Sequence, residues 1–266
     1  MILKWPGGKK WIPHKHKLIL PTQYNTYLEP FLGGGSVFFN LNPKNSILSD
    51  INERLINLFT ELKENPEELF KKTNDLINTH DDDQYYGIRE KFNTKEPSAV
   101  HFLYLNRTCF NGVYRENKKG EFNVPVGRRN SSYFPFVQED FLRLSKVLKN
   151  SKLRHQGFKE TLMEAKEGDF IFVDPPYLKK EDNYESFRKY GKDVFARKDL
   201  LELAEILHSL EDKCKILVSN FDLDNVKTLF PNWNKEPVEQ MSYISGTGKG
   251  RKNMKEVLIY NYEKSQ

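Results

Sequence analysis

The chain has 266 residues and a formal net charge of +5, and 13% of its residues are aromatic. This length allows a large core with a smaller inserted lobe, and the modest positive charge weakly favours a polyanionic partner. The two cysteines form no C-x-x-C pair, and no apolar stretch approaches the roughly 18 residues of a membrane span. His14 and His16 have no further ligand-type neighbours. We therefore expect no structural disulfides, no membrane partner and no metal site.

Near the N-terminus, within residues 27–39, a short predicted strand enters a glycine-rich turn, and a helix follows the turn. Gly33 and Gly35 fit the first two positions of the dinucleotide motif G-x-G-x-x-G, but Phe38 stands where the third glycine would be. Because those glycines let the backbone and the helix approach a pyrophosphate closely, Phe38 argues against NAD or FAD and for a ligand without phosphates.

A second apolar strand ends in Asp50, about where such folds bind ribose hydroxyls. A nucleoside without a pyrophosphate fits S-adenosylmethionine. A plain glycine-rich turn and a strand-capping aspartate would explain either feature alone equally well. The occurrence of both features in this order favours the cofactor interpretation.

The middle of the chain is predicted to be mostly helical. Apolar spacing indicates helices over 54–64, 67–79, 99–105 and 137–149. Asn111-Gly112 is a turn signal, and residues 117–120 are typical of the tip of a hairpin between 113–115 and 122–124.

Alternation of strand and helix then resumes toward the C-terminus. Strand patterns cover 152–156, 170–173, 215–219 and 257–260, and a helix pattern covers 198–210. We therefore predict a catalytic domain formed by residues 1–54 and 146–266. Residues 55–145 are predicted to be an inserted, mostly helical domain that carries a β-hairpin.

The strand predicted over 170–173 runs directly into Asp174, Pro175, Pro176 and Tyr177. A buried strand that ends in a carboxylate places it at the carboxyl edge of an α/β sheet, where such folds build their sites. The two prolines fix the backbone and remove two N–H donors, which leaves carbonyl oxygens free to accept. A common Asp-Pro turn is the alternative, but it does not account for the full pattern.

A carboxylate, a rigid carbonyl and an aromatic ring together suit the binding of an exocyclic amine on a planar base. The amino nitrogen of adenine shares its lone pair with the ring and is a poor nucleophile. If Asp174 and the Pro175 carbonyl each accept one of its hydrogens, the nitrogen becomes more tetrahedral and its lone pair can aim at a methyl group. Tyr177 would stack on the base, so positioning and electrostatics carry the step.

Five motifs occur in order, at residues 4–9, 29–36, 106–115, 120–127 and 174–177. This series resembles the Dam-type DNA adenine N6-methyltransferases, which belong to the D12 class and the alpha group. The resemblance implies a class I S-adenosylmethionine-dependent methyltransferase fold, an α/β, Rossmann-like mixed seven-stranded sheet with an inserted target-recognition domain. It also implies site-specific methylation of adenine N6 in double-stranded DNA.

The resemblance further implies roles for individual residues. The catalytic tetrad that receives the flipped adenine is Asp174, Pro175, Pro176 and Tyr177. The cofactor-binding residues are Trp5, Lys9, Pro30, Phe31, Gly33, Gly35, Ser36, Asp50 and Asp174. Phe158 is a candidate wall of the cofactor's adenine pocket, at a point where the family often carries an acidic residue. The DNA-binding residues are Lys4, Phe110, Asn111 and Arg115, with Arg128 and Arg129 as phosphate contacts.

Several alternatives stay open at this point. An N4-cytosine methyltransferase uses similar chemistry, an RNA or protein-glutamine methyltransferase shares the sheet, and a catalytically silent DNA-binding protein could retain the scaffold. GATC is the first expectation for the recognition site, and a restriction endonuclease is a candidate functional partner. The expected location is cytoplasmic, with association to the nucleoid when the protein is bound to DNA.

Overall fold

The computed structural model describes residues 2–94, 98–127, 136–178, 195–241 and 253–264. Within these ranges the chain forms a seven-stranded sheet in the order β3-β2-β1-β4-β5-β7-β6. The strands are β1 (Tyr27–Glu29), β2 (Ser46–Asp50), β3 (Ser151–His155), β4 (Phe170–Val173), β5 (Lys215–Phe221), β6 (Asn234–Met241) and β7 (Asn253–Tyr260). Strands β1 to β5 pair in parallel, and β7 lies antiparallel between β5 and β6. The mixed seven-stranded α/β sheet expected from the sequence is confirmed.

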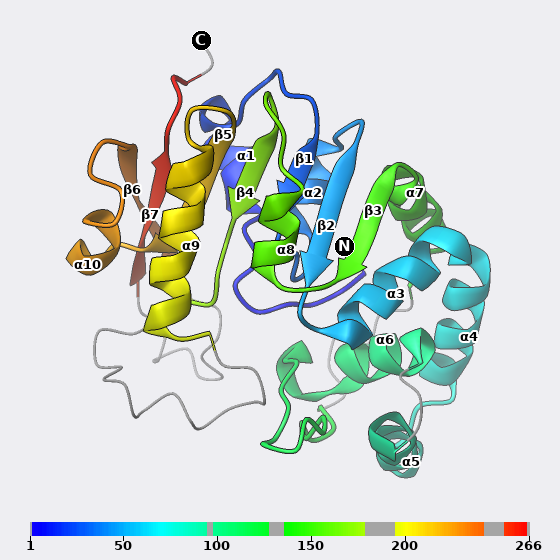
Figure 1. The fold of residues 1–266 in the computed structure, drawn as a ribbon. Coiled ribbons are helices and arrows are strands. Elements are labelled where there is room, and N and C mark those ends of the chain that lie inside the picture. Colours follow the sequence, from blue (N-terminus) through cyan, green and yellow to red (C-terminus); the bar gives the residue numbers. More distant parts are fainter. Residues whose placement is uncertain (1, 95–97, 128–135, 179–194, 242–252, 265–266) are drawn as a thin grey trace.

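Helices cover both faces of this sheet (Figure 1). The α-helices are α1 (Trp11–Lys15), α2 (Ser36–Leu41), α3 (Glu53–Glu64), α4 (Pro66–Asn78), α5 (Asp82–Thr94), α6 (Ala99–Thr108), α7 (Gln138–Leu148), α8 (Phe158–Met163), α9 (Arg197–Leu210) and α10 (Asp224–Lys227). Two short 3-10 helices are η1 (Lys17–Ile19) and η2 (Phe110–Gly112). In Figure 1, α8 and α9 lie in front of the sheet, and α3 to α7 gather beside the β3 edge.

The central strands β1, β2, β4 and β5 are largely buried because helices cover both faces of the sheet. In β4, Phe170 and Phe172 belong to the buried cluster that includes α2 and α3. Ile171 and Val173 point the other way, into the cluster that includes α8 and α9. This alternation follows from the two-residue period of a strand. Asp174 directly follows Val173 and is the first polar residue after β4, so it lies at the carboxyl end of this strand.

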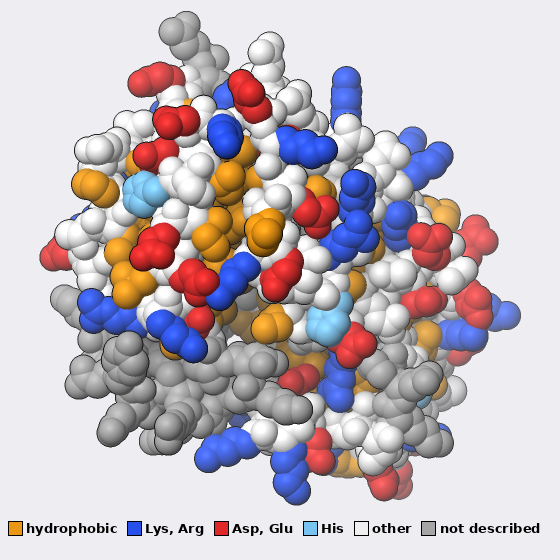
Figure 2. Space-filling view, viewed as in Figure 1, with side chains coloured by type: hydrophobic (Ala, Val, Ile, Leu, Met, Phe, Trp, Pro, Cys, Tyr) orange, Lys and Arg blue, Asp and Glu red, His pale blue; other side chains and the backbone are white. Residues whose placement is uncertain are grey.

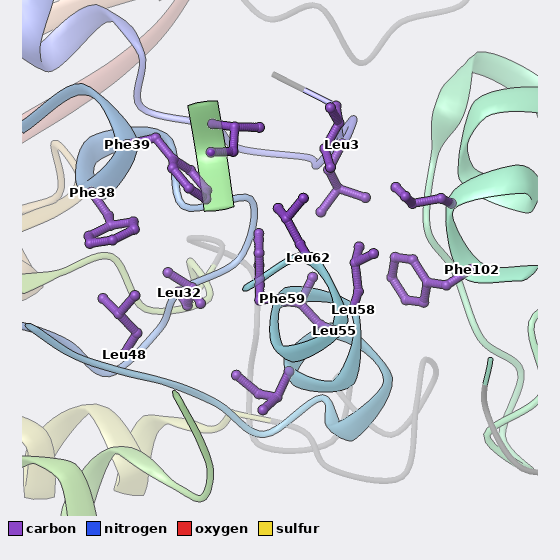
Figure 3. Close-up of a cluster of buried hydrophobic side chains, with 14 of the residues drawn as sticks. Leu3, Leu32, Phe38, Phe39, Leu48, Leu55, Leu58, Phe59, Leu62 and Phe102 are labelled. Atoms are coloured by element: carbon purple, nitrogen blue, oxygen red, sulfur yellow. The ribbon is translucent and has the colours of Figure 1, made fainter. Parts of the chain in front are cut away.

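Helix α3 connects the core of the sheet to the helices that follow. Leu58 and Phe59 of α3 share a buried cluster with Phe102 of α6, with Phe39 of α2 and with Leu48 of β2. Figure 3 shows α3 between Phe102 on one side and Phe39 and Leu48 on the other. The predicted domain boundary at residue 55 thus falls inside a helix that packs in both directions, and the division itself stays a prediction.

The helix ends follow recognisable capping signals. The Asn52 side chain accepts a hydrogen bond from the Leu55 N–H at 3.1 Å and begins α3. Pro66 stands in the first turn of α4, where its missing N–H costs nothing. The Ser98 side chain caps α6 by accepting from the His101 N–H. The helices predicted over 54–64 and 67–79 are therefore confirmed as α3 and α4.

Two parts of the insert differ from expectation. Helix α6 continues to Thr108, beyond the expected end at residue 105. The chain reverses over 117–120 as expected, but the flanking segments form one isolated bridge, Glu116 to Phe122, instead of paired strands. Backbone hydrogen bonds flank this bridge on both sides, from the Asn117 N–H to the Glu121 carbonyl and from the Asn123 N–H to the Arg115 carbonyl. The ladder does not continue beyond them because Pro125 has no N–H to donate.

Figure 2 shows lysine and arginine side chains interspersed with acidic ones on the face that carries α8 and α9. An ion pair between Lys159 and Glu202 joins these two helices. Among the described helices, none combines the length and the apolar character that crossing a membrane requires. In the same part of the chain, His, Cys, Asp and Glu side chains form no group of three or more that could hold a metal ion.

The stability of the shared core can be tested at Phe59, whose side chain is 1% exposed. We expect Phe59→Ala to lower the free energy of unfolding by about 3–5 kcal/mol, because a cavity forms in the cluster that joins α3 to the sheet. Met163→Ala, at an exposed position, is the matched control and should change stability by less than about 0.5 kcal/mol. Urea denaturation measures both, and equal midpoints for the two variants would contradict the shared core.

Candidate active site

The candidate site lies at the carboxyl edge of the parallel strands, the lower edge of the sheet in Figure 1. Strand β1 ends at Glu29, β2 ends at Asp50, and Asp174 follows β4. Because β1 pairs in parallel with both β2 and β4, the ends of these three strands meet at one edge. The two motifs that begin at Glu29 and Asp174 and the predicted ribose-binding residue Asp50 are thereby brought together.

The glycine turn after β1 is held by Asp50 and covered by Trp5. Gly33 and Gly35 have φ values of +49° and +63°, a left-handed conformation that favours glycine. The Gly33 N–H donates to Asp50 Oδ2 at 2.9 Å. A Cβ on Gly33 would lie 3.0 Å from the Trp5 indole, so the turn and the ring are in close contact. Three predicted cofactor-binding residues, Trp5, Gly33 and Asp50, therefore lie together.

Two acidic side chains of this region are influenced by burial. Burial raises the pKa of Asp50 above its ordinary value. The hydrogen bonds that it accepts from backbone N–H groups, including that of Asn52 at 2.9 Å, oppose this effect. Glu29 is 2% exposed, and burial holds its pKa well above the ordinary value. The Tyr27 hydroxyl donates to Glu29 Oε2 at 2.8 Å. Asp50 is thus a fixed acceptor at the site, whereas Glu29 is enclosed beneath the turn.

Lys9 is the cation of the site, and its side chain is 4% exposed. Its Nζ lies 3.2 Å from Asp174 Oδ2 and 3.6 Å from Glu256 Oε2. It also donates to the Gly7 carbonyl at 2.7 Å. The Lys9 backbone N–H donates to Ser36 Oγ at 2.8 Å, which ties the N-terminal segment to the first turn of α2. Lys9 and Ser36 therefore join the turn to the end of β4.

Tyr177 is anchored by its hydroxyl group. It donates to Glu256 Oε2 at 2.9 Å, and Ser219 Oγ lies 2.7 Å away. The Tyr177 ring meets Phe221 at 4.6 Å between centroids, with 62° between the planes, and Lys9 Nζ lies 4.7 Å from its centre. The ring and its hydroxyl are thus restrained from several directions.

Asp174 retains one unused acceptor. Its Oδ2 faces Lys9, but its Oδ1 is buried and accepts no hydrogen bond from the residues that the structure describes. Burial raises the pKa of Asp174 to about 6, with Lys9 lowering it and Glu256 raising it. A buried oxygen without a donor is costly unless a ligand supplies one. Asp174 Oδ1 is therefore suited to accept a hydrogen from a bound molecule.

Glu256 and Ser219 contact the predicted catalytic residues but were not predicted from the sequence as site residues. Both lie outside the five motifs, on β7 and β5, which pair at the edge of the site. A usable signal existed at Glu256, because this glutamate directly precedes the apolar run over 257–260 and is therefore a candidate buried acid. Ser219 offered no comparable signal, since a serine in a strand is common.

The predicted wall of the adenine pocket is an aromatic group. Phe31 follows β1 and stacks on Phe158 with 5.6 Å between ring centroids and 23° between planes. Phe195 meets Phe31 edge-on at 5.7 Å. Pro30 is buried beside this group. The Gln156 side chain does not take the place of an acidic pocket residue, because its amide donates to Thr161 and to Glu164.

Lys4 is bound to the insert by the side-chain amide of Asn106. The Lys4 N–H donates to Asn106 Oδ1 at 3.0 Å, and Asn106 Nδ2 donates to the Lys4 carbonyl at 2.8 Å. The Lys4 side chain crosses Gly112, where a Cβ would lie only 2.3 Å from Lys4 Cδ. The next residue, Trp5, stacks on Tyr114 at 5.3 Å. The cofactor segment and the expected DNA-binding segment are therefore in contact.

The remaining predicted DNA-binding residues lie around η2. Phe110 is 48% exposed, and Asn111 is exposed with a φ of +56°. Arg115 is exposed, and its Nε donates to Asn123 Oδ1 at 2.9 Å. Lys4, Phe110 and Asn111 thus lie close together, with Arg115 on the segment that follows. Arg128 and Arg129 lie outside the described residues.

Comparison with known proteins identifies the family. The profile described as D12 class N6 adenine-specific DNA methyltransferase matches residues 5–244. A DNA adenine methylase from Serratia marcescens is 34% identical over 96% of this chain and 96% of its own length. The Type II methyltransferase M.MjaIII from Methanocaldococcus jannaschii is 33% identical over 98% of both chains. The Type II methyltransferase M1.LlaDCHI from Lactococcus lactis subsp. cremoris is 29% identical over 97% of this chain and 94% of its own length.

These matches span nearly the whole chain. They confirm the expected family and favour adenine over cytosine as the modified base. The chain therefore belongs to the D12 class of N6 adenine-specific DNA methyltransferases.

Proposed function

We propose that the chain transfers a methyl group from S-adenosylmethionine to N6 of an adenine that is flipped out of duplex DNA, at GATC sites. The observation that carries this proposal concerns Asp174 Oδ1, a buried carboxylate oxygen at the end of β4. No described residue donates a hydrogen bond to it. An exocyclic amino group supplies the missing donor. Its second hydrogen goes to the Pro175 carbonyl, which the following proline keeps rigid.

The chemistry follows from these acceptors. When both amino hydrogens are accepted, the lone pair of N6 leaves conjugation with the ring and becomes available for the new N–C bond. Lys9 engages Asp174 Oδ2 and leaves Oδ1 to the base. Since the pKa of Asp174 is raised to about 6 by burial, the group is a carboxylate at neutral pH. It can take the proton that N6 releases once the methyl group is attached.

The residues at the glycine turn fit S-adenosylmethionine, which supplies the methyl group on its sulfonium. Asp50 is held by two backbone N–H groups and is placed to accept ribose hydroxyls. Phe38, which replaces the third glycine of a dinucleotide site, is fully buried in the core, so the start of α2 is not shaped for a pyrophosphate. Asp50 and Asp174 give the edge the negative charge that a cationic cofactor needs.

DNA binding is assigned to the surface around η2. A methyltransferase cannot reach an adenine inside a stacked duplex, so the base must leave the helix. Phe110 is exposed and suited to fill the vacated space, while Lys4, Asn111 and Arg115 carry groups that pair with base edges. Burial and the neighbouring Arg107 lower the pKa of Lys4, as expected in a cationic region that awaits an anion.

Further DNA contacts and a functional partner belong to the same proposal. Arg128 and Arg129 would contact phosphates, which position the protein without reading sequence. Pairing with a restriction endonuclease is supported by two relatives that carry the name Type II methyltransferase.

The reaction and its site can be tested together. Purified protein is incubated with unmethylated plasmid DNA and S-adenosylmethionine, and modified bases are mapped by single-molecule sequencing. We expect N6-methyladenine confined to GATC. Methylation at another short site would overturn only the assigned sequence, whereas unmodified DNA from folded protein would overturn the proposed reaction.

The pH profile tests the role of Asp174. Because the reaction needs its carboxylate form, kcat/KM should be constant above pH about 6 and fall about tenfold per pH unit below it. Asp174→Asn should lower kcat by about 10²–10³-fold. The exposed Asp212→Asn is the matched control and should retain the wild-type profile. A profile with no acid limb in the wild-type enzyme would contradict this role.

Arg115 tests base readout. If Arg115 pairs with a base, Arg115→Ala should cost about 1–3 kcal/mol at one base pair and relax the preference there. The measurement is kcat/KM on the cognate duplex and on duplexes with single substitutions. Lys118→Ala, at an exposed position of the same turn, is the control and should leave these ratios unchanged. Equal weakening on all duplexes by Arg115→Ala would instead identify a phosphate contact.

A further inference from the structure

Glu256 contacts the catalytic residues although it belongs to none of the five motifs. It enters the site from β7, whose register with β5 places it opposite Phe221. Its side chain is 9% exposed, so its charge must be compensated by neighbours. Its Oε2 accepts from the Tyr177 hydroxyl at 2.9 Å and lies 3.6 Å from Lys9 Nζ and 3.5 Å from Ser219 Oγ.

We propose that Glu256 is a positioning residue, which orients Tyr177 and shares the Lys9 ammonium with Asp174 so that one Asp174 oxygen stays available to the target base. This inference rests on the proposed function, because it assigns Asp174 the role of acceptor for the adenine amino group. It adds to that function a residue from the C-terminal strand.

The first part of the role is geometric. A hydrogen bond at the para position of a phenol fixes the axis of the ring but not its plane. Glu256 and Ser219 fix the axis of Tyr177 through its hydroxyl, whereas the contacts with Phe221 and Lys9 restrain its plane. A ring held in this way presents a defined surface to a planar base without a rotational search.

The second part is electrostatic. The charged and titratable groups that face Asp174 are Lys9 and Glu256, with Tyr177 on its own segment and Tyr27 and Glu29 on β1. If Lys9 faced Asp174 alone, the whole attraction of the ammonium would fall on the Asp174 carboxylate and weaken it as an acceptor and as a base. Glu256 draws part of that attraction to itself.

The direction of the expected change follows from these charges. Lys9 lowers the pKa of Asp174 and Glu256 raises it. Glu256→Gln removes the charge and retains the size, so the pKa of Asp174 should fall. The acid limb of the pH profile should then move to lower pH by about one pH unit. A side chain that only fills space would not move this limb.

The test measures methyl transfer to unmethylated plasmid DNA from pH 5 to pH 9. For Glu256→Gln we expect the shifted acid limb together with a kcat lowered by about 10- to 100-fold, because Tyr177 loses its charged partner. The control is Glu239→Gln on the adjacent strand β6, where the glutamate is exposed, and it should match the wild type. An acid limb at the wild-type pH, with kcat within about twofold of wild type, would overturn the inference.

A conservative variant keeps the test decisive if Glu256→Gln does not fold. Glu256→Asp retains the charge beside Lys9 but is one methylene too short to hold the Tyr177 hydroxyl. Its acid limb should stay at the wild-type pH while kcat falls, and an unchanged kcat would count against the positioning role. Failure of the proposed function has a different signature, since the wild-type enzyme itself would then form no N6-methyladenine.

Discussion

The burial of the Lys9 ammonium is the interaction on which the rest of the site depends. A cation that is 4% exposed is tolerated only if opposite charges and hydrogen-bond acceptors surround it. Asp174, Glu256 and the Gly7 carbonyl supply them. These groups come from the N-terminal segment, from the end of β4 and from β7. The pairing of one lysine therefore holds together parts of the chain that are far apart in sequence, and it sets which oxygen of Asp174 remains available for a substrate.

The segment that carries Lys9 also links the surface proposed to bind DNA with the turn proposed to bind the cofactor. Within a few residues it passes from the insert, where Asn106 holds the Lys4 backbone, to the glycine turn, which Trp5 covers. A displacement of η2 by DNA would act on Lys4 and Trp5 directly, and Lys9 lies at the other end of the same short peptide. Coupling between the proposed DNA-binding surface and the proposed catalytic carboxylate thus needs no long pathway, because one segment contacts both.

Much of this arrangement was predictable from sequence, for reasons that particular residues illustrate. Asp50 and Asp174 end apolar strands, and the carboxyl ends of parallel strands share one edge, so their proximity follows from topology alone. Glu256 and Ser219 could not be placed this way, because their role depends on the register of the antiparallel pair β5 and β7, which apolar patterning does not specify. The hairpin expected around 117–120 is limited to one bridge because Pro125, on its second segment, has no N–H to extend the ladder.

Phe38 contributes both to the proposed selectivity for the cofactor and to the stability of the fold. Its ring stacks on Tyr27 at 6.2 Å and packs edge-on against Phe39 at 4.9 Å, so it belongs to the cluster that joins the sheet to α3. The feature that makes the turn unsuited to a pyrophosphate is therefore the same side chain that fills the core behind it. Restoring a glycine at this position would not recreate a dinucleotide site, since it would remove an aromatic ring from the core before any phosphate could bind. The preference for the proposed nucleoside cofactor without phosphates is in this sense part of how the protein folds.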